Sequence, residues 1–412
     1  MDGSVGAVYD PLERHVQDPY PLFARARQEE PVFWSETMRA WVVTRYDDVR
    51  RVLQQHETFS TANALRSPKP LHPDAAAVLG RGFPPSSAII NVNGERHLRV
   101  RAPLAKRLGS DAVAAMEPDV RSRANTLVAA IEQGTSAELM AGYARVLPVE
   151  TISDICGIAP ADRALVRDGA YACVAVITGG ASRETEVAAA ELFLEFQELM
   201  AACVRERRER PGGDAFSEIV TALAPGNGPL DDAQLAELVW TFVGLITAGH
   251  STTTALLGNG LYHLLSRPEQ WKLLCDRPEL IPSAVEEIAR FDTPVHAFFR
   301  STARPVTLGG RELPEGADVV ALYSSANRDP EVFERAEEFD VTRGVSRHLT
   351  FGHGVHACVG ARLARLQLAV TLETLTARLP GLRLAPGREV RMARQFVDHA
   401  PVALHVEWDR HA

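Results

Sequence analysis

The sequence predicts a mainly α-helical fold with small β-sheets. Long stretches carry apolar residues at helical spacing, above all residues 231–265 and 359–379. Short stretches with β-branched residues and alternating polarity lie between turn signals, as in residues 31–44. The 412 residues could form two or three domains, but no linker, low-complexity run or internal repeat divides them. We therefore expect one large domain.

Charge and cysteine content narrow the possible environments and partners. A net charge of −9 argues against nucleic acid as a partner, because no broad basic excess exists to neutralise phosphates. The five cysteines form no CxxC pair, which favours a reducing cytosol. The start of the chain lacks a basic and then apolar segment, so we expect neither a signal peptide nor a membrane anchor.

The first ninety residues alternate between regular and irregular patterns. Helical spacing at residues 20–28 is followed by the strand pattern of a hairpin at residues 31–44, and then by helical spacing at residues 47–54. Residues 59–90 are rich in proline and glycine and show no periodicity. A segment of this length without regular structure is usually functional or mobile.

His97 and Arg101 are four residues apart, so they share one face of the next expected helix. Such a pair suits a ligand with buried carboxylates, which need cationic or hydrogen-bonding partners. A solvated basic face explains the pair equally well. Helical stretches then fill residues 118–210, with one break at residues 178–182.

The stretch Asp231–Leu265 is predicted to be a long buried helix. It opens with a capping box, Asp231 and Gln234, and ends before a proline. Polar residues 250–254 interrupt its apolar run, which is then too short to cross a bilayer. The Thr252 hydroxyl can bond back to the carbonyl of Ala248, which bends a helix and opens space beside it. A purely structural role for these threonines remains the alternative.

Cys358 lies in a glycine-rich turn, residues 351–360, immediately before the last long helix. Glycines let the backbone lie flat against a large planar cofactor. Free N–H groups and the positive end of the helix dipole favour thiolate, and a thiolate is a ligand for haem iron. Three other readings compete: a dinucleotide fingerprint, a metal site with His353 and His356, and a buried structural cysteine.

The loop Phe351-Gly352-x-Gly354-x-His356-x-Cys358-x-Gly360 resembles the haem-binding signature of cytochromes P450. The likeness extends from about residue 18 to residue 406 and includes three further motifs in the family's order. They are His97-x-x-x-Arg101, Ala248-Gly249-x-x-Thr252-Thr253 and Glu287-x-x-Arg290. The resemblance implies the P450 fold, one triangular-prism domain over residues 1–412 with residues 1–17 as an N-terminal extension, and haem b as cofactor.

The resemblance also implies roles for individual residues. Cys358 would bind iron, Thr252 with Ser251, Ala248 and Gly249 would form the oxygen side, and Glu287 and Arg290 would be a structural pair. The remaining cofactor residues would be His97, Arg101, Arg300, His348, Phe351, Gly352, His356 and Gly360. The substrate pocket would be lined by Leu245, Val295, Ala297, Phe298 and Phe396, the last at a turn tip near the end of the chain.

One position departs from the family pattern, because Ser251 stands where the family has an acid. A carboxylate there helps to relay protons, whereas serine passes them only through water or a neighbour. Proton delivery is therefore expected to be slower. The basic residues Arg96, Arg99, Lys106, Arg107, Arg362 and Arg365 are expected to form a docking patch for an acidic electron carrier.

The expected activity is that of a cytoplasmic, monomeric haem-thiolate monooxygenase using O2 and electrons from a separate ferredoxin and ferredoxin reductase. The expected reaction is hydroxylation or oxidative dealkylation of a small hydrophobic, possibly aromatic molecule. Natural-product tailoring by aromatic C–C or C–N coupling, for example of an indole or cyclic dipeptide, is the alternative within the family. A haem-binding carrier or sensor without catalysis is the alternative from another class.

Overall fold

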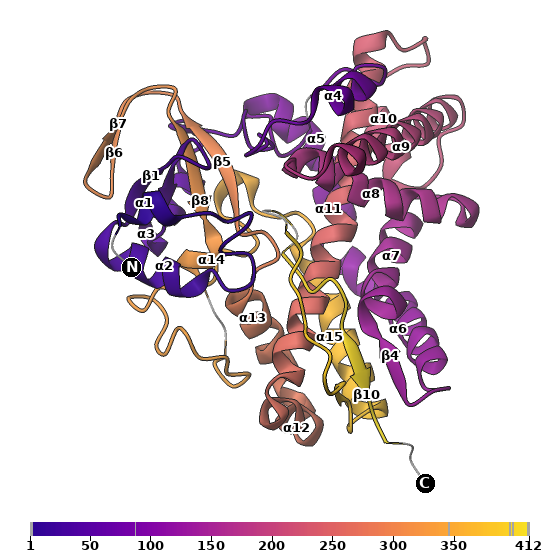
Figure 1. The fold of residues 1–412 in the computed structure, drawn as a ribbon. Coiled ribbons are helices and arrows are strands. Elements are labelled where there is room, and N and C mark those ends of the chain that lie inside the picture. Colours follow the sequence, from indigo (N-terminus) through magenta and orange to yellow (C-terminus); the bar gives the residue numbers. More distant parts are fainter. Residues whose placement is uncertain (1–2, 87, 345–346, 395–396, 398, 410–412) are drawn as a thin grey trace. The chain divides into compact units, whose positions relative to one another are not determined.

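The computed structural model describes residues 3–86, 88–344, 347–394, 397 and 399–409. Helices predominate and the sheets are small (Figure 1), as the sequence predicts. The chain divides into two compact units. The first contains Met1–Ser60, Ala115–Leu147 and Thr252–Ala412, and the second contains Thr61–Ala114 and Pro148–Ser251. The expectation of one domain stays a prediction.

A five-stranded mixed sheet lies in the first unit, with the strand order β1-β2-β8-β5-β3. The predicted hairpin is confirmed, because β1 and β2 pair antiparallel with Trp34 opposite Trp41. Strand β8 joins β2 in parallel and β5 in antiparallel fashion, with Phe298 opposite Ala321. The strands are β1 (Val32–Ser35), β2 (Ala40–Val43), β3 (Phe59–Ser60), β5 (Ala297–Thr302) and β8 (Asp318–Leu322).

Two smaller sheets complete the β structure described in the first unit. The predicted turn at Gly309-Gly310 joins a two-stranded sheet, and both glycines have the positive φ that such a turn requires. A three-stranded antiparallel sheet has the order β4-β10-β9. The strands are β6 (Val306–Leu308), β7 (Arg311–Leu313), β4 (Ser136–Glu138), β9 (Arg383–Leu384) and β10 (His405–Glu407).

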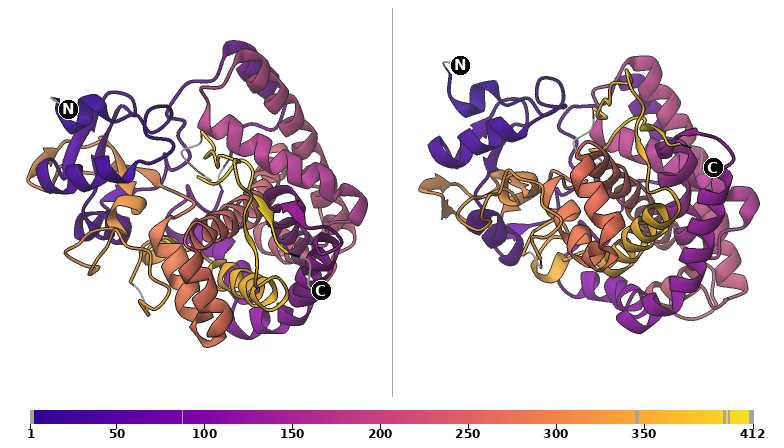
Figure 2. Two further views of the ribbon diagram at one scale, coloured as in Figure 1. Left: turned by 60° about the horizontal axis from the view of Figure 1, so that its bottom comes forward. Right: turned by 90° about the horizontal axis from the view of Figure 1, so that it is seen from below.

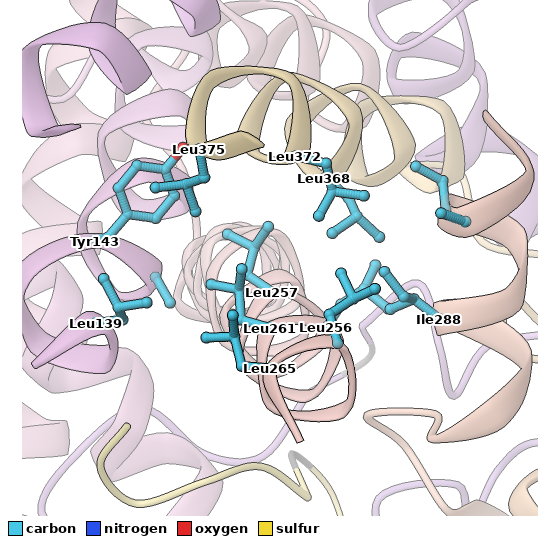
Figure 3. Close-up of a cluster of buried hydrophobic side chains, with 14 of the residues drawn as sticks. Leu139, Tyr143, Leu256, Leu257, Leu261, Leu265, Ile288, Leu368, Leu372 and Leu375 are labelled. Carbon is cyan, nitrogen blue, oxygen red and sulfur yellow. The ribbon is translucent and has the colours of Figure 1, made fainter. Parts of the chain in front are cut away.

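Leucine-rich helix faces form the main core of this unit. Leu257 and Leu261 of α11 point toward Leu368 and Leu372 of α15, with Tyr143 at one side (Figure 3). Two further views show α13 next to α15 (Figure 2). Helices of this unit are α1 (Val5–Val8), α2 (Tyr20–Glu29), α3 (Tyr46–Gln54), α12 (Pro268–Asp276), α13 (Ile281–Phe291), α14 (Tyr323–Ala326) and α15 (Ala361–Arg378).

The second unit is helical over its described residues. Helices α8 and α9 are antiparallel neighbours joined by the turn at residues 179–182, where the sequence predicts a break. The Ser182 hydroxyl accepts a hydrogen bond from Thr185 N at 3.3 Å and so caps the N-terminus of α9. The helices are α4 (Pro73–Leu79), α5 (Gly94–Arg107), α8 (Arg163–Thr178), α9 (Arg183–Glu209) and α10 (Ala215–Leu223).

Three helices contain a unit boundary: α6 (Ser110–Ile131), α7 (Val146–Cys156) and α11 (Asp232–Leu265). The predicted capping box at the start of α11 is confirmed. Gln234 N donates to Asp231 Oδ1 at 2.8 Å, and the Gln234 side chain returns to Asp231 N at 3.1 Å. No helix in the part of the chain that the structure describes is long and apolar enough to cross a membrane.

The predicted N-terminal extension stays a prediction; its residues Val5 and Tyr9 are buried in a cluster with Phe23 and Phe33 of the same unit. One expectation differs from the structure. The irregular segment 59–90 contains strand β3 and helix α4. Pro73 begins α4 with φ preset for a helix, and the His72 side chain accepts from Asp74 N. Helix α4 has 7 residues, about two turns, and this is too short for periodicity to reveal.

Candidate functional site

The glycine-rich loop brings Cys358 to the surface of the first unit. Among the five cysteines only Cys358 is exposed; three are buried and Cys275 is half-buried. Cys358 N donates to Phe351 O at 2.7 Å, which closes the loop. Gly352 and Gly354 have φ of 69° and 73°, and a Cβ on Gly354 would lie 2.9 Å from Leu53 O. The loop conformation therefore requires these glycines.

Helix α15 begins at Ala361, with Gly360 as its N-cap. Cys358 thus lies just before the helix, at the end where free N–H groups favour negative charge. A Cβ on Gly360 would lie 3.9 Å from Cys358 Sγ. A Cβ at position 360 would make an ordinary van der Waals contact with the sulfur, and its absence leaves that contact open.

The oxygen-side motif lies in the middle of α11. Ser251 is buried and its hydroxyl donates to Thr247 O at 2.9 Å, whereas Thr252 is half-buried. The predicted bond from Thr252 to Ala248 stays a prediction. A Cβ on Gly249 would lie 2.8 Å from Ile152 Cδ1, so the close approach at this glycine is made by a side chain of α7.

The other predicted cofactor residues occupy different surroundings. In the second unit His97 is buried and Arg101 half-buried on α5, one turn apart. In the first unit the Arg300 side chain is buried, and its Nη1 donates to Phe299 O at 2.7 Å. Burial raises the pKa of Tyr323, and the nearby Arg300 guanidinium opposes that shift. His356 is half-buried in the cysteine loop.

His348 has protein partners at both ring nitrogens. Its Nδ1 accepts from Thr350 N at 3.3 Å, and its Nε2 lies 3.2 Å from Glu286 Oε2. Glu286 also holds Arg365 in a bidentate pair. Burial works to raise the pKa of Glu286, but the hydrogen bonds from His348 and Arg365 outweigh this effect and lower the pKa to about 2. These contacts favour a structural role for His348, in supporting the cysteine loop, over a role in binding a carboxylate.

Three predicted pocket residues lie on strand β5 or just before it. Val295 and Ala297 are buried and Phe298 is half-buried, with its ring edge against Tyr323. Val295 also forms an isolated bridge with Val397 of the C-terminal segment. Leu245, predicted for the same pocket, is buried on α11 in the second unit. The prediction for Phe396 lies outside the described residues.

Glu287 and Arg290 form a bidentate ion pair on α13, with both N–O distances 2.8 Å and both side chains fully buried. Arg290 also donates to three carbonyl groups, those of Asn327, Ala336 and Glu338. Glu287 accepts in addition from Arg343 Nε and Asp340 N. The pair thus fixes the irregular segment that leads to the cysteine loop. Sequence reasoning missed Arg343 and Glu286.

Comparison with known proteins decides the family. The model of the cytochrome P450 family matches residues 270–380. Nocardicin C N-oxygenase from Nocardia uniformis subsp. tsuyamanensis is 36% identical over 95% of this chain and 96% of its own length. The chain belongs to the cytochrome P450 family. Like its relatives, this P450 is a monooxygenase that binds haem b.

Other relatives of this P450 have varied substrates. Mycinamicin IV hydroxylase/epoxidase from Micromonospora griseorubida is 35% identical over 90% of this chain and 89% of its own. Among solved structures, cytochrome P450 CREJ in complex with (4-ethylphenyl) dihydrogen phosphate has a TM-score of 0.91 and 30% identity, covering 98% of this chain and all of that one. These likenesses show the P450 fold.

The residues of the first unit fit a haem. An exposed thiol at a helix N-terminus, an absent side chain at Gly360 and a buried arginine suit a metalloporphyrin with two carboxylates. Cys358 would hold the iron, and Arg300 and His356 would hold propionates. His97 and Arg101 of the second unit stay further predicted propionate partners.

Replacing Glu287 by glutamine should destabilise the fold by about 3–5 kcal/mol, because Arg290 and Arg343 would lose their buried counter-charge. The urea midpoint of unfolding measures this change. Glu279→Gln is the matched control, since Glu279 pairs with Arg277 at the exposed surface and such pairs contribute little to stability. Equal midpoints for the two variants would contradict the role assigned to Glu287.

Proposed function

We propose that this P450 oxidises a small hydrophobic molecule with an aromatic ring, by hydroxylation or oxidative dealkylation, with Cys358 as the iron ligand. The observation that carries the proposal is the exposed Cys358 thiol in its glycine-rich turn. Phe298, half-buried beside Tyr323, supports an aromatic substrate, as does the 4-ethylphenyl ligand of the CREJ structure. Haem supplies activation of dioxygen when bound; the protein's residues bind and orient the substrate and deliver protons.

Each group of residues has a proposed task. Cys358 would hold the iron, and Arg300 and His356 of the first unit would neutralise propionates, with His97 and Arg101 of the second unit as further predicted partners. Val295, Ala297 and Phe298 of the first unit would exclude water and orient the substrate, and Leu245 of the second unit is a further predicted pocket residue. Thr252 holds a proton near the oxygen side, and Ser251 takes part in its delivery. Glu287 and Arg290 keep the cysteine loop in place.

A second candidate is natural-product tailoring, including aromatic coupling of an indole or a cyclic dipeptide. It is favoured by the names of two relatives, which act on nocardicin C and mycinamicin IV. Both reactions would use O2 and electrons from a separate ferredoxin and reductase, in a monomeric protein of the cytoplasm. A carrier without catalysis would bind substrate but consume no NADPH in response.

Replacing Cys358 by serine should abolish the Soret band of the reduced, carbon-monoxide-treated protein that gives the family its name, because that band depends on thiolate ligation. Cys275→Ser, at a half-buried cysteine of α12, should leave it unchanged. A screen of aromatic acids, indoles and cyclic dipeptides for the high-spin shift, followed by product analysis, then separates the two substrate classes. A persistent band in Cys358→Ser would refute the proposed ligand.

Ser251→Asp should increase the fraction of NADPH electrons that reach product. The serine hydroxyl donates to Thr247 O and is buried, so it is poorly placed to exchange protons with solvent. An aspartate can accept and release a proton beside Thr252, and proton transfer by a positioned side chain contributes about 10²–10⁴-fold. Product per NADPH measures coupling, with Ser251→Asn as the isosteric control. Equal coupling in both variants would count against this role.

The exposed basic residues of α5 are proposed to dock the electron carrier. Arg96 is paired with Glu237, Arg107 with Glu218, and Arg365 with Glu286. Arg99, Lys106 and Arg362 are exposed and make no ion pair with any residue that the structure describes. These three are therefore the residues most available to an acidic partner.

Reversing the charge at Arg99 and Lys106 should slow reduction by a ferredoxin and weaken its dependence on salt, because steering between opposite charges is screened by ions. Stopped-flow reduction at low and high ionic strength measures both effects. Arg388→Glu changes the charge of an exposed residue near the C-terminus and serves as control. A rate equal to that of the control at low salt would remove α5 from the docking surface.

A further inference from the structure

Five side chains of the first unit form a buried polar cluster around Asp292, here named the Asp292 cluster: Tyr20, His263, Asp292, His296 and His399. The Tyr20 hydroxyl donates to Asp292 Oδ1 at 2.6 Å, and His263 Nε2 lies 2.7 Å from Oδ2. His399 Nδ1 lies 3.4 Å from Oδ1. None of these contacts belongs to the P450 motifs.

The partners fix the protons on two of the imidazoles. His399 Nε2 lies 2.9 Å from Val16 O, and a carbonyl only accepts, so Nε2 carries a proton. The other nitrogen, Nδ1, faces a carboxylate oxygen and needs a proton as well, since two lone pairs would otherwise oppose each other. His399 is therefore an imidazolium paired with the Asp292 carboxylate.

His263 differs from His399. Arg267 Nη1 donates to His263 Nδ1 at 3.3 Å, so that nitrogen is an acceptor, and Nε2–H donates to Asp292. Burial lowers the pKa of His263 despite Asp292, which agrees with a neutral ring. Burial also works to lower the pKa of His399, but the Asp292 carboxylate outweighs it and raises the value. The charge thus resides on His399.

A metal ion is the other occupant that this chemistry suggests. Asp292, His296 and His399 each offer a ligand atom, and these atoms lie within 4.8 Å of one another. However, Asp292 already accepts from Tyr20 and His263, and the Arg328 guanidinium lies 3.3 Å from the centre of the Tyr20 ring. A dication would add to an existing buried cation, so the cluster is better balanced as an ion pair.

The pair joins the two chain segments that border the proposed substrate pocket. His399 N donates to Pro294 O at 2.8 Å, and Asn259 Nδ2 donates to the carbonyls of both Asp292 and His399. The His296 ring contacts the His399 ring in a tilted arrangement, with a centroid distance of 4.3 Å and an interplanar angle of 39°. His296 lies between Val295 and Ala297 in the sequence. A displacement of the His399 ring would therefore displace His296 and, with it, these two predicted pocket residues.

We propose that Asp292 and His399 are positioning residues for the substrate, and that their ion pair holds the Val295–Phe298 segment against the C-terminal segment in the arrangement that binds substrate. This inference rests on the proposed function, which places Val295 and Phe298 at the pocket. It adds a proton-dependent control that acts from behind the pocket wall, through groups that touch neither substrate nor haem.

The direction of the pH effect follows from the pKa shifts of Asp292 and His399. Burial would raise the pKa of Asp292, but His399 and His263 lower it well below its usual range, so Asp292 stays charged down to acid pH. His399, with a raised pKa, keeps its proton below the ordinary histidine value of about 6.5 and loses it as pH rises through the raised value. The arrangement is therefore expected to weaken on the alkaline side.

Groups from every neighbouring element face the pair. Helix α2 contributes Tyr20 and helix α11 contributes His263, while Arg267 immediately precedes α12 and Arg328 follows α14. Burial and His399 lower the pKa of His296 well below its usual range, so His296 stays neutral. Tyr20 also stays neutral, because burial and Asp292 raise its pKa. His399 is thus the group of the cluster whose charge changes as pH rises through its raised pKa.

The test uses haem-loaded protein and 4-phenylimidazole, an azole whose nitrogen binds haem iron and whose ring fills the pocket. His399→Gln should bind it on the order of tenfold more weakly than wild type near pH ~6, since small misplacements cost up to about 10²-fold. The ratio should fall toward one as pH rises through the raised pKa of His399, where wild type loses the same proton. Comparing ratios at each pH cancels titration of the probe.

Matched variants separate positioning from general damage. His405→Gln makes the same substitution in β10, outside the cluster, and should follow wild type at every pH. Asp292→Asn removes the other charge and should show the same pH-dependent ratio to wild type as His399→Gln. The double variant should bind no more weakly than either single one, because residues that act as a unit are not additive.

A ratio that stays constant with pH, or binding by both variants equal to wild type, would overturn the inference. The carbon-monoxide band of the wild type is measured first. Its absence would defeat the proposed function, whereas its presence together with a flat pH profile would defeat the positioning role alone. Should His399→Gln fail to bind haem, Asp292→Asn decides by the same criteria.

Discussion

The structure of the first unit depends on a buried ion pair, Glu287 with Arg290. Both side chains are completely removed from solvent, which is costly unless every donor and acceptor finds a partner. The carbonyls of Asn327, Ala336 and Glu338 accept from Arg290, and Arg343 and Asp340 N donate to Glu287. Helix α13 thereby fixes the irregular segment that follows α14, which has little secondary structure of its own to stabilise it. The cysteine loop follows directly from that segment.

Small residues recur where this P450 needs chemistry. The cysteine loop depends on left-handed glycines, and α11, a continuous helix, carries small and hydroxyl residues in its middle. Ser251 bonds to its own helix backbone, and Gly249 accommodates Ile152. The cysteine loop has little regular structure of its own, so it depends on the leucine-rich core of α11 and α15 for stability.

Local signals in the sequence predicted the helices and the motifs well. The capping box of α11, the hairpin of β1 and β2 and the pair on α13 all depend on residues within a few positions of one another. Contacts between distant residues were less accessible. Glu286 holds both His348 and Arg365, and no spacing rule links these three. The contacts of His348 are with other protein groups, so they give no support to the propionate role predicted for it.

The Asp292 cluster shows the same limit more clearly. Tyr20 and Asp292 are 272 positions apart, and His399 lies in a segment whose pattern predicted only a turn tip. A single histidine on an apolar segment has no sequence signal that tells a charged group from a neutral one. Its protonation depends on Val16 O and on a carboxylate, and only folded coordinates bring these together.

The burial of the other cysteines has a practical consequence for maturation. Three thiols are inside the fold and one is half covered, so an alkylating or oxidising reagent reaches Cys358 first. Reducing conditions during expression would keep this thiol available as a ligand for haem iron.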